Sequence, residues 1–243
     1  MITVEIGGAE FAEITIDRHH KRNALDVAHL DEIASAVEAS VASGARAVLI
    51  TGSGSAFSAG ADLDGVYGDG FRRALYAAID AITHAPIPVI AAVNGPAIGA
   101  GTQLAIACDL RVAAPTAVFA VPTARNGLAV DPWTIQRLNG LAGGATTRAL
   151  LLGCDTLDAL DAHSRGLADR IGSVEDARVL ALEIATFAPL SLQYSKTAIR
   201  MLTEPASWDG QLDEQFERCW NSADFAESQI ARAENRAPRF VGK

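Results

Sequence analysis

Two short apolar segments, each followed directly by a loop of small residues, constrain the fold more than any other feature. Residues 47–50 are Ala-Val-Leu-Ile, and residues 88–93 are Pro-Val-Ile-Ala-Ala-Val. Strands that are apolar without alternation are buried on both faces, which is typical of sheets covered by helices. Helical spacing of apolar residues separates these segments. The sequence therefore predicts an α/β fold with loops at the strand ends.

The remaining elements are predicted from the same periodicities. Period-two alternation at Val4–Ile6 and at Phe11–Ile16, with two glycines between, predicts a β-hairpin. A third buried strand is expected at Leu110–Ala113. The helices predicted from 3.6-residue spacing cover residues 26–43, 71–83, 132–141, 144–152, 175–187, 190–203, 209–221 and 223–234. This helix-rich C-terminal part is expected to be a packed region, either an oligomerisation surface or a capping layer.

Charge and composition exclude several classes of function. The 243 residues include 29 acidic and 20 basic side chains, a formal charge of −9, whereas nucleic-acid binding needs a basic surface. Hydrophobic residues make up 49% of the chain, enough for a buried core. Three cysteines without a CxxC pair argue against a disulfide framework and favour a reducing compartment. Without a signal-peptide pattern or a long apolar run, we expect a cytoplasmic protein with no transmembrane segment.

The two loops after the buried strands have a composition that suits ligand binding. They cover residues 52–63 and 94–103 and contain mostly Gly, Ala, Ser and other small residues. Small side chains let a ligand approach the backbone, and a helix beginning near Gly101 would direct free N–H groups at a developing oxyanion. Two such loops side by side could polarise one carbonyl group. The alternative for each loop alone is ordinary turn chemistry.

At these loops the sequence resembles the enoyl-CoA hydratase/isomerase, or crotonase, superfamily. The first loop ends in the family-like segment Ala59–Leu63, and the second matches from Ala92 to Gly101 and continues to Leu110. The likeness extends, in order, over essentially the whole chain. Further matching segments are Lys21–Leu25, Phe119–Pro122, Gly127–Ala129, Gln136–Leu138 and Arg239–Phe240.

This resemblance implies a crotonase (ClpP-like) spiral of repeated ββα units. Residues 1–190 would form the core with an acyl-CoA site, and residues 191–243 a C-terminal helical region for oligomerisation. The family assembles as homotrimers that often pair into hexamers. The implied ligand is a coenzyme A thioester of fatty-acid metabolism, an acyl-CoA or enoyl-CoA. No separate cofactor and no metal ion are expected.

The resemblance also implies which residues hold the ligand. The backbone N–H groups of Ala61 and Ala100 would form an oxyanion hole for the thioester oxygen. Backbone groups of Ala24, Ala59 and Ala61 would hydrogen-bond around the adenine and pantetheine. Three cationic side chains are candidates for binding the phosphates: Lys21, Arg22 and Lys243. The alternative is that these cations are ordinary solvated residues.

The family pattern breaks where the catalytic side chains should stand. Hydratases carry one glutamate two residues after the Gly-rich turn and another just after the later proline, and these positions are Gln103 and Thr123 here. Hydration needs groups that orient water, accept its proton and protonate the α-carbon. Neither an amide nor a hydroxyl exchanges protons near neutral pH. Because each acid or base contributes about 10²–10⁴ in rate, we expect no ordinary hydratase turnover.

One carboxylate keeps an enzymatic function open. Asp131 corresponds to an aspartate that dienoyl-CoA isomerases use as one member of an acid/base pair. A single base can move a double bond by removing a proton at one carbon and returning it at another. The alternative is structural, since Asp131-Pro132 is typical of a helix N-cap followed by proline in the first turn. The other two carboxylate positions of those isomerases fall on Gln103 and Thr123.

Two functions of different classes therefore stay open. The first is a non-catalytic acyl-CoA binder, and the second is an enoyl-CoA double-bond isomerase, or a weak hydratase, that uses Asp131. Apolar side chains at Ile98, Phe119 and Trp133 favour a fatty acyl chain in the pocket.

Other motifs are set aside on their spacing. His19 and His20 are adjacent and lack metal-ligand spacing. The Gly52-Ser53-Gly54 segment lacks the rest of a dinucleotide-binding fingerprint, and the sequence contains no Gly-x-Ser-x-Gly nucleophile elbow.

Overall fold

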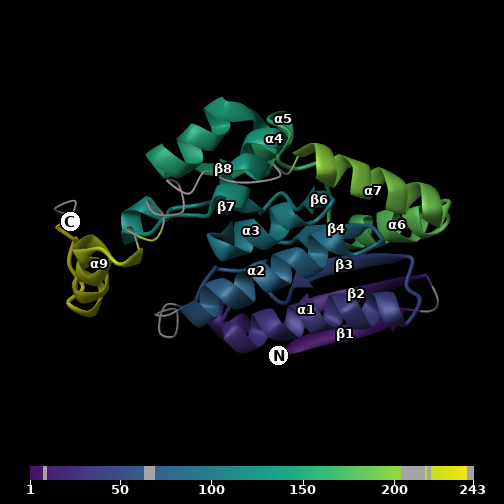
Figure 1. Ribbon diagram of the computed structural model, residues 1–243, viewed down its shortest axis with the longest axis horizontal. Helices are drawn as coiled ribbons and strands as arrows, with labels where there is room; N and C mark the ends of the chain where they lie inside the picture. Colours follow the sequence, from purple (N-terminus) through teal and green to yellow (C-terminus); the bar gives the residue numbers. More distant parts are fainter. Residues whose placement is uncertain (8–9, 63–68, 204–216, 218–219, 240–243) are drawn as a thin grey trace.

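Two β-sheets and the helices around them make up the computed structural model of the protein (Figure 1). The structure describes residues 1–7, 10–62, 69–203, 217 and 220–239. In the larger sheet β1 and β2 are antiparallel and the other neighbours are parallel. Its strands, in spatial order, are β1 (Ile2–Gly7), β2 (Phe11–Ile16), β3 (Ala47–Gly52), β4 (Val89–Val93), β6 (Leu110–Ala113) and β9 (Arg170–Ile171). The smaller sheet contains β5 (Ala97–Ile98), β7 (Val118–Ala120) and β8 (Thr156–Asp158), in that order.

Helices follow pairs of strands, as the expected ββα repeat requires. The order β1-β2-α1, β4-β5-α3 and β6-β7-α4 gives three such units, so the predicted α/β class is confirmed. The helices are α1 (Val27–Ala42), α2 (Asp69–His84), α3 (Ala100–Ala107), α4 (Pro132–Arg148), α5 (Ala159–Ser164), α6 (Val174–Ala185), α7 (Pro189–Thr203) and α9 (Ala223–Ala233). Short helical turns are η1 (His19–Lys21), η2 (Ala124–Asn126) and the π-helical η3 (Ala149–Gly153).

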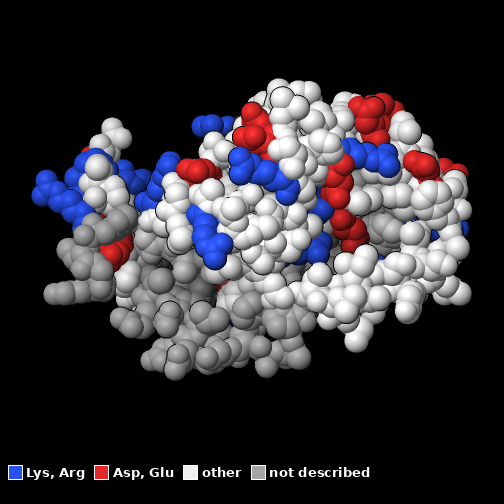
Figure 2. Space-filling view, turned by 90° about the horizontal axis from the view of Figure 1, so that it is seen from above, with Lys and Arg blue, Asp and Glu red and all other residues white. Residues whose placement is uncertain are grey.

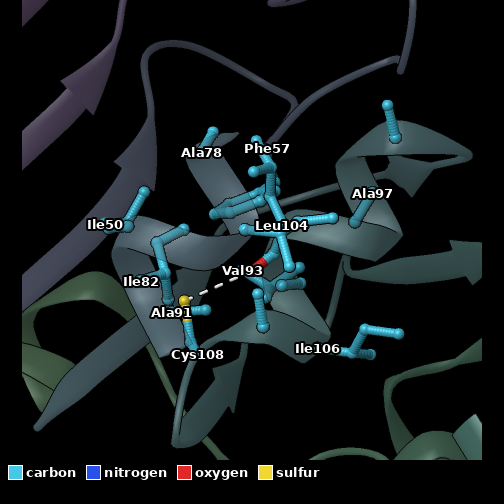
Figure 3. Close-up of a cluster of buried hydrophobic side chains, with 14 of the residues drawn as sticks. Ile50, Phe57, Ala78, Ile82, Ala91, Val93, Ala97, Leu104, Ile106 and Cys108 are labelled. Atoms are coloured by element: carbon cyan, nitrogen blue, oxygen red, sulfur yellow. Dashed lines mark hydrogen bonds between the residues drawn. The ribbon is translucent and has the colours of Figure 1, made fainter. Parts of the chain in front are cut away.

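The larger sheet is buried on both faces, which explains its apolar strands. Helices α1, α2 and α3 lie side by side over one face (Figure 1), and Ile50, Phe57 and Leu104 belong to the core there. Helix α6 covers the opposite face, where Leu49 and Ile90 pack against it in a second cluster. Figure 3 shows Leu104 and Ile106 of α3 among the side chains of the first cluster. Because alternate residues of β3 face opposite clusters, every position of this strand is buried.

Most predicted elements are found near their expected bounds. The hairpin, the three apolar strands and the helices over residues 26–43, 71–83, 175–187, 190–203 and 223–234 are confirmed. The helix expected at 132–141 is the first part of α4, and that expected at 144–152 is the last part of α4 together with η3; Gly143, inside α4 at φ 76°, breaks the helical path between the two parts. The helix expected at 209–221 falls mainly outside the described residues. The domain boundary predicted after residue 190 lies inside α7 and stays a prediction.

Helix α7 is fixed to the core by one buried cation. Lys196 Nζ lies 2.8 Å from Asp109 Oδ2 and donates to the carbonyls of Ile82 and Ile87. Among the described residues, no helix is long and apolar enough to span a bilayer. Cys108 and Cys154 are buried free thiols, and Cys219 lies outside the described residues. On the face drawn in Figure 2, acidic and basic side chains of the described residues are interspersed.

Candidate functional site

The two small-residue loops lie against each other, as their position after neighbouring strands predicts. A parallel bridge joins Ser58 to Ala97. The Ser58 N–H donates to the Pro96 carbonyl at 3.1 Å, and the Ile98 N–H donates to the Ser58 carbonyl at 2.9 Å. The hydroxyl of Ser58 donates to the Asn23 carbonyl. The loops thus form one rigid unit, tied to the segment after η1.

Glycine at position 60 is required by this close approach. Its φ is +89°, and a Cβ atom there would lie 2.5 Å from the Ile98 carbonyl oxygen. The same Cβ would lie 3.5 Å from the Ala100 nitrogen, which shows how closely the start of α3 approaches the first loop. A side chain at this position would force the loops apart.

Two backbone N–H groups beside this contact have no hydrogen-bond partner among the described residues: those of Ala61 and Ala100. Leu25 N–H donates to the Gly60 carbonyl, and Asp62 N–H donates to the Leu25 carbonyl. In such a parallel bridge the N–H of the intervening residue, Ala61, points away from Leu25. Ala100 is the first residue of α3, where helix N–H groups lack internal acceptors.

Two ion pairs hold the C-terminal end of the first loop in place. Asp62 Oδ2 lies 2.7 Å from Arg18 Nη1 and 3.0 Å from Lys21 Nζ, so the Asp62 carboxylate joins the loop to η1. The Lys21 cation predicted for the phosphates is thus already paired. Arg22 is exposed, and its carbonyl accepts from the Ala59 N–H at 2.9 Å. The third candidate, Lys243, lies outside the described residues.

A pocket opens over these loops and is lined mainly by apolar groups. Ala59, Ala61, Ile98 and Ala100 all belong to its wall, so the structure brings these predicted residues together. Ala24 is buried and is not part of the described wall. The polar and charged residues along the described wall are Arg72, Tyr76, Gln103, Thr123, Asn126 and Asp131.

Gln103, Asp131 and Thr134 form a closed hydrogen-bond network at this wall. Gln103 Nε2 donates to Asp131 Oδ2 at 3.0 Å and to Thr134 Oγ1 at 2.8 Å. The Thr134 hydroxyl donates to Asp131 Oδ2 at 2.6 Å, and the Thr134 N–H donates to Asp131 Oδ1 at 3.0 Å. The amide nitrogen is assigned to this side because a carboxylate only accepts.

Asp131 therefore has the structural role that was one of the two alternatives for this residue. It is the N-cap of α4, and Pro132 occupies the first turn. The residue is 8% exposed, and its side chain accepts three hydrogen bonds, out of about four lone-pair positions of a carboxylate. Little acceptor capacity is left for a proton from a ligand.

Two other ionisable side chains, Tyr76 and Arg72, line the pocket. Burial raises the pKa of Tyr76 above its ordinary value of 10.0, and the nearby Asp131 carboxylate raises it further, so the phenol stays neutral at physiological pH. Arg72 donates to Glu217 Oε1 at 2.8 Å and to Oε2 at 3.2 Å. No cluster of metal-binding side chains occurs in the part of the chain that the structure describes.

The remaining predicted pocket residues divide between different environments. Thr123 and Ile98 line the pocket. The Phe119 side chain is fully buried in the core beneath β7. Trp133 lines a neighbouring hollow with Asp80 and His84, so its acyl-binding role stays a prediction, as does that of Phe119.

Comparison with known proteins places this site in a family. The family model described as enoyl-CoA hydratase/isomerase matches residues 7–243. The chain belongs to the enoyl-CoA hydratase/isomerase family. It is 43% identical over 237 residues to the probable enoyl-CoA hydratase echA6 of Mycobacterium tuberculosis, covering 94% of this chain and 95% of that protein.

Solved structures of the family confirm the predicted crotonase fold. An enoyl-CoA hydratase/isomerase from Pseudoalteromonas atlantica superposes with a TM-score of 0.86 at 31% identity, covering 99% of both chains. Methylmalonyl CoA decarboxylase superposes with a TM-score of 0.91 at 25% identity, covering 100% of this chain and 98% of that one. The two structures carry different catalytic names on one fold, so function must be argued from the side chains of the pocket.

Several residues that line the pocket or hydrogen-bond to its wall were not predicted from the sequence. Thr134 stands at the third helical position after the Asp131 cap, a spacing at which capping partners are common, and this signal could have found it. Arg72 and Glu217 are 145 residues apart in the sequence, so no local sequence pattern predicts their pairing. Tyr76 and Trp220 likewise reach the pocket through tertiary packing.

Proposed function

We propose that this protein binds a fatty acyl-CoA or enoyl-CoA thioester and does not hydrate it. The observation that carries the proposal is the closed network of Gln103, Asp131 and Thr134, which stands beside unpartnered backbone N–H groups in one pocket. Neither of the two expected catalytic glutamates is present. This chain thus has the backbone groups that would bind the thioester but lacks the side chains that would carry out the hydration.

Backbone geometry supports the binding half of the proposal. The N–H groups of Ala61 and Ala100 would donate to the thioester oxygen, with the positive end of the α3 dipole behind Ala100. These donors belong to the main chain and remain whatever side chains replace the glutamates. Ala24 and Ala59 would contribute backbone groups to the pantetheine and adenine, with no additional cofactor.

The side chains of the pocket support the absence of hydration. A hydratase must position water and transfer protons at two sites. Here the amide of Gln103 cannot exchange a proton, Thr123 carries a hydroxyl, and Tyr76 is kept neutral by burial. Asp131 is used by the α4 cap. No described side chain in the pocket is free to act as a general base.

Calorimetric titration with three ligands tests the binding half. The ligands are octanoyl-CoA, its thioether analogue without the carbonyl oxygen, and coenzyme A alone. If two N–H groups hold that oxygen, the thioether should bind about 10- to 100-fold more weakly than the thioester, since each hydrogen bond contributes roughly 0.5–1.5 kcal/mol. Equal affinities for thioester and thioether would refute the oxyanion-hole assignment.

The second candidate function is a double-bond isomerase that uses Asp131. It is favoured by one observation, which is that this carboxylate lines the pocket. Asp131→Asn separates the two functions because asparagine still caps a helix but cannot accept a proton. An isomerase would lose at least about 10² in rate. We expect acyl-CoA affinity to be retained and no isomerase activity to be measurable in either form.

We propose a homotrimer, or a hexamer of two trimers, as the assembled state. Helix α7 exposes large apolar side chains that a further copy could cover: Leu190, Tyr194, Ile199, Met201 and Leu202. Light scattering coupled to size-exclusion chromatography tests this assembly. A monomer at micromolar concentration would contradict it.

A further inference from the structure

Two neighbouring hollows meet along helix α2. The first is the pocket over the loops, and the second is a groove between α2 and the start of α4. Arg72 lines the pocket and not the groove, Tyr76 lines both, and Asp80 lines the groove and not the pocket. Because these residues are four positions apart, they lie in one row on the same face of the helix. Helix α2 therefore passes from the pocket to the groove at Tyr76.

The segment that leads into α4 makes the same passage. Val130 lines the pocket, Asp131 lines both hollows, and Trp133 lines the groove. The Asp131 carboxylate is close enough to Tyr76 to raise the pKa of the phenol. Hydrogen bonds from Gln103 and from the α4 cap hold that carboxylate in place. Tyr76 and Asp131 thus form the boundary between the pocket and the groove.

The groove beyond this boundary has a surface that suits an alkyl chain. Ile79, which is 6% exposed, and Trp133 line it with apolar groups. Its charged residues, Asp80 and His84, pair with each other at 2.9 Å and are 71% and 46% exposed, so they lie towards the solvent. From Tyr76 to His84 the groove follows α2 for about 12 Å, at 1.5 Å per residue. Each methylene group buried there would raise affinity about fourfold.

We propose that Tyr76 is a specificity-determining residue that sets the longest acyl chain the pocket accepts. Its ring stands where the end of a lengthening chain would pass from the pocket into the groove. Chains that end before the ring gain affinity from every added methylene group. Longer chains must displace the ring or turn towards the solvent, and gain nothing. The inference rests on the proposed function, since it specifies the chain-length class of the same thioester site.

The test measures affinity against chain length for saturated thioesters from butyryl- to hexadecanoyl-CoA, by calorimetry in steps of two methylene groups. In the natural protein the affinity should rise up to a limiting length and then stay level or fall. In Tyr76→Ala the rise should continue for at least two more methylene groups. The first chain beyond the natural limit should then bind at least about tenfold more tightly, relative to butyryl-CoA, than it does in the natural protein.

Three variants control for the hydroxyl, for stability and for added space. Tyr76→Phe keeps the ring and should keep the natural limit. Tyr76→Leu removes the ring but retains more of the core contacts of this partly buried residue, and should shift the limit in the same direction as Tyr76→Ala. Leu128 lines the pocket and not the groove, so Leu128→Ala enlarges the pocket without opening the boundary. Its limiting chain length should equal that of the natural protein, whatever its overall affinity.

A second measurement locates the end of the chain. A bromine atom at the last carbon of the acyl chain quenches the fluorescence of a tryptophan that it touches. For a brominated chain just beyond the natural limit, Trp133→Phe should remove part of the quenching in Tyr76→Ala and none in the natural protein.

The outcomes separate this inference from the proposed function. If Tyr76→Ala and Tyr76→Leu bind butyryl-CoA and keep the natural limit, the role of Tyr76 alone is overturned. A longer limit in Tyr76→Phe or Leu128→Ala, or a natural affinity that still rises at hexadecanoyl-CoA, would overturn it as well. Failure of every thioester to bind the natural protein would overturn both claims.

Discussion

The two sides of the pocket present different kinds of group, backbone amides on one side and side chains on the other. On the loop side, the groups available to a ligand are backbone amides, fixed by Gly60 and by the bridge between Ser58 and Ala97. On the side facing α4, the polar groups are the side chains of Gln103 and Asp131, which are hydrogen-bonded to each other. An amino-acid substitution leaves the backbone amide in place, but it replaces the whole side chain and with it any catalytic group. Ligand binding and catalysis can therefore be lost separately on one frame.

The largest expected effect comes from restoring the two missing catalytic glutamates on the side of the pocket that faces α4. Gln103→Glu with Thr123→Glu supplies both glutamates, but the new carboxylate would stand where Gln103 Nε2 now lies, 3.0 Å from Asp131. Two carboxylates so close disfavour each other's ionisation, so Asp131→Asn is added. The triple variant should hydrate a trans-2-enoyl-CoA at least about 10²-fold faster than the natural protein.

Absorbance of the conjugated thioester follows this reaction. The double variant without Asp131→Asn serves as the control and should gain less. A triple variant that binds the thioester with natural affinity but hydrates no faster would show that more than acid and base groups has been lost.

The arrangement of the two loops is disrupted most directly by a substitution at Gly60. Gly60→Ala should weaken acyl-CoA binding by about 10²-fold, because the new Cβ displaces Ile98 and misaligns the two N–H donors. Calorimetry with octanoyl-CoA measures the loss. Gly44→Ala is the matched control, since Gly44 also has a positive φ, +85°, but a Cβ atom there would meet no other atom within 4 Å. That control should lose only about 1 kcal/mol of unfolding free energy and keep its affinity.

A smaller effect tests whether Asp131 is structural. Asp131→Ala removes the α4 cap and deprives the Gln103 amide and the Thr134 hydroxyl of their acceptor. The loss should be about 2–3 kcal/mol of unfolding free energy in denaturant titrations. Asp158→Ala, which removes only the exposed cap of α5, should cost about 1 kcal/mol. Equal losses in the two variants would argue against the buried network.

An effect on stability alone, and only at high pH, is expected at the C-terminal end of α3, where Cys108 is buried in the core. Burial raises the pKa of the Cys108 thiol from 9.0 to about 12, and Figure 3 shows this thiol donating to the Leu104 carbonyl. Above pH 9 the unfolded chain releases this proton while the folded chain keeps it, so the stability contribution is complete below pH 9 and is lost towards pH 12.

Denaturant titrations over that range measure the slope. The unfolding free energy of the natural protein should fall by up to about 1.4 kcal/mol per pH unit more than that of Cys108→Ala. Acyl-CoA affinity at neutral pH should be the same in both, because Cys108 lies at the opposite end of α3 from Ala100. Parallel pH profiles would contradict the assigned burial effect.

The sequence predicts those features that local patterns determine. The apolar strand at residues 47–50 is recognisable because both of its faces are buried, and the Asp131 cap because proline follows it. Phe119 lies in β7 with its side chain fully buried in the core, and its predicted contact with an acyl chain stays a prediction. Contacts such as Gln103 with Asp131, or Arg72 with Glu217, depend on packing between distant segments. No local periodicity encodes them.

Binding without turnover is tested most directly by mass analysis of a trans-2-enoyl-CoA incubated with near-stoichiometric natural protein in heavy water. Binding is first established by an increase in melting temperature. We expect a thioester that stabilises the fold and is recovered with unchanged mass. Addition of one water molecule would contradict this function by showing hydration despite Gln103 and Thr123, and deuterium incorporation without water addition would identify an isomerase instead.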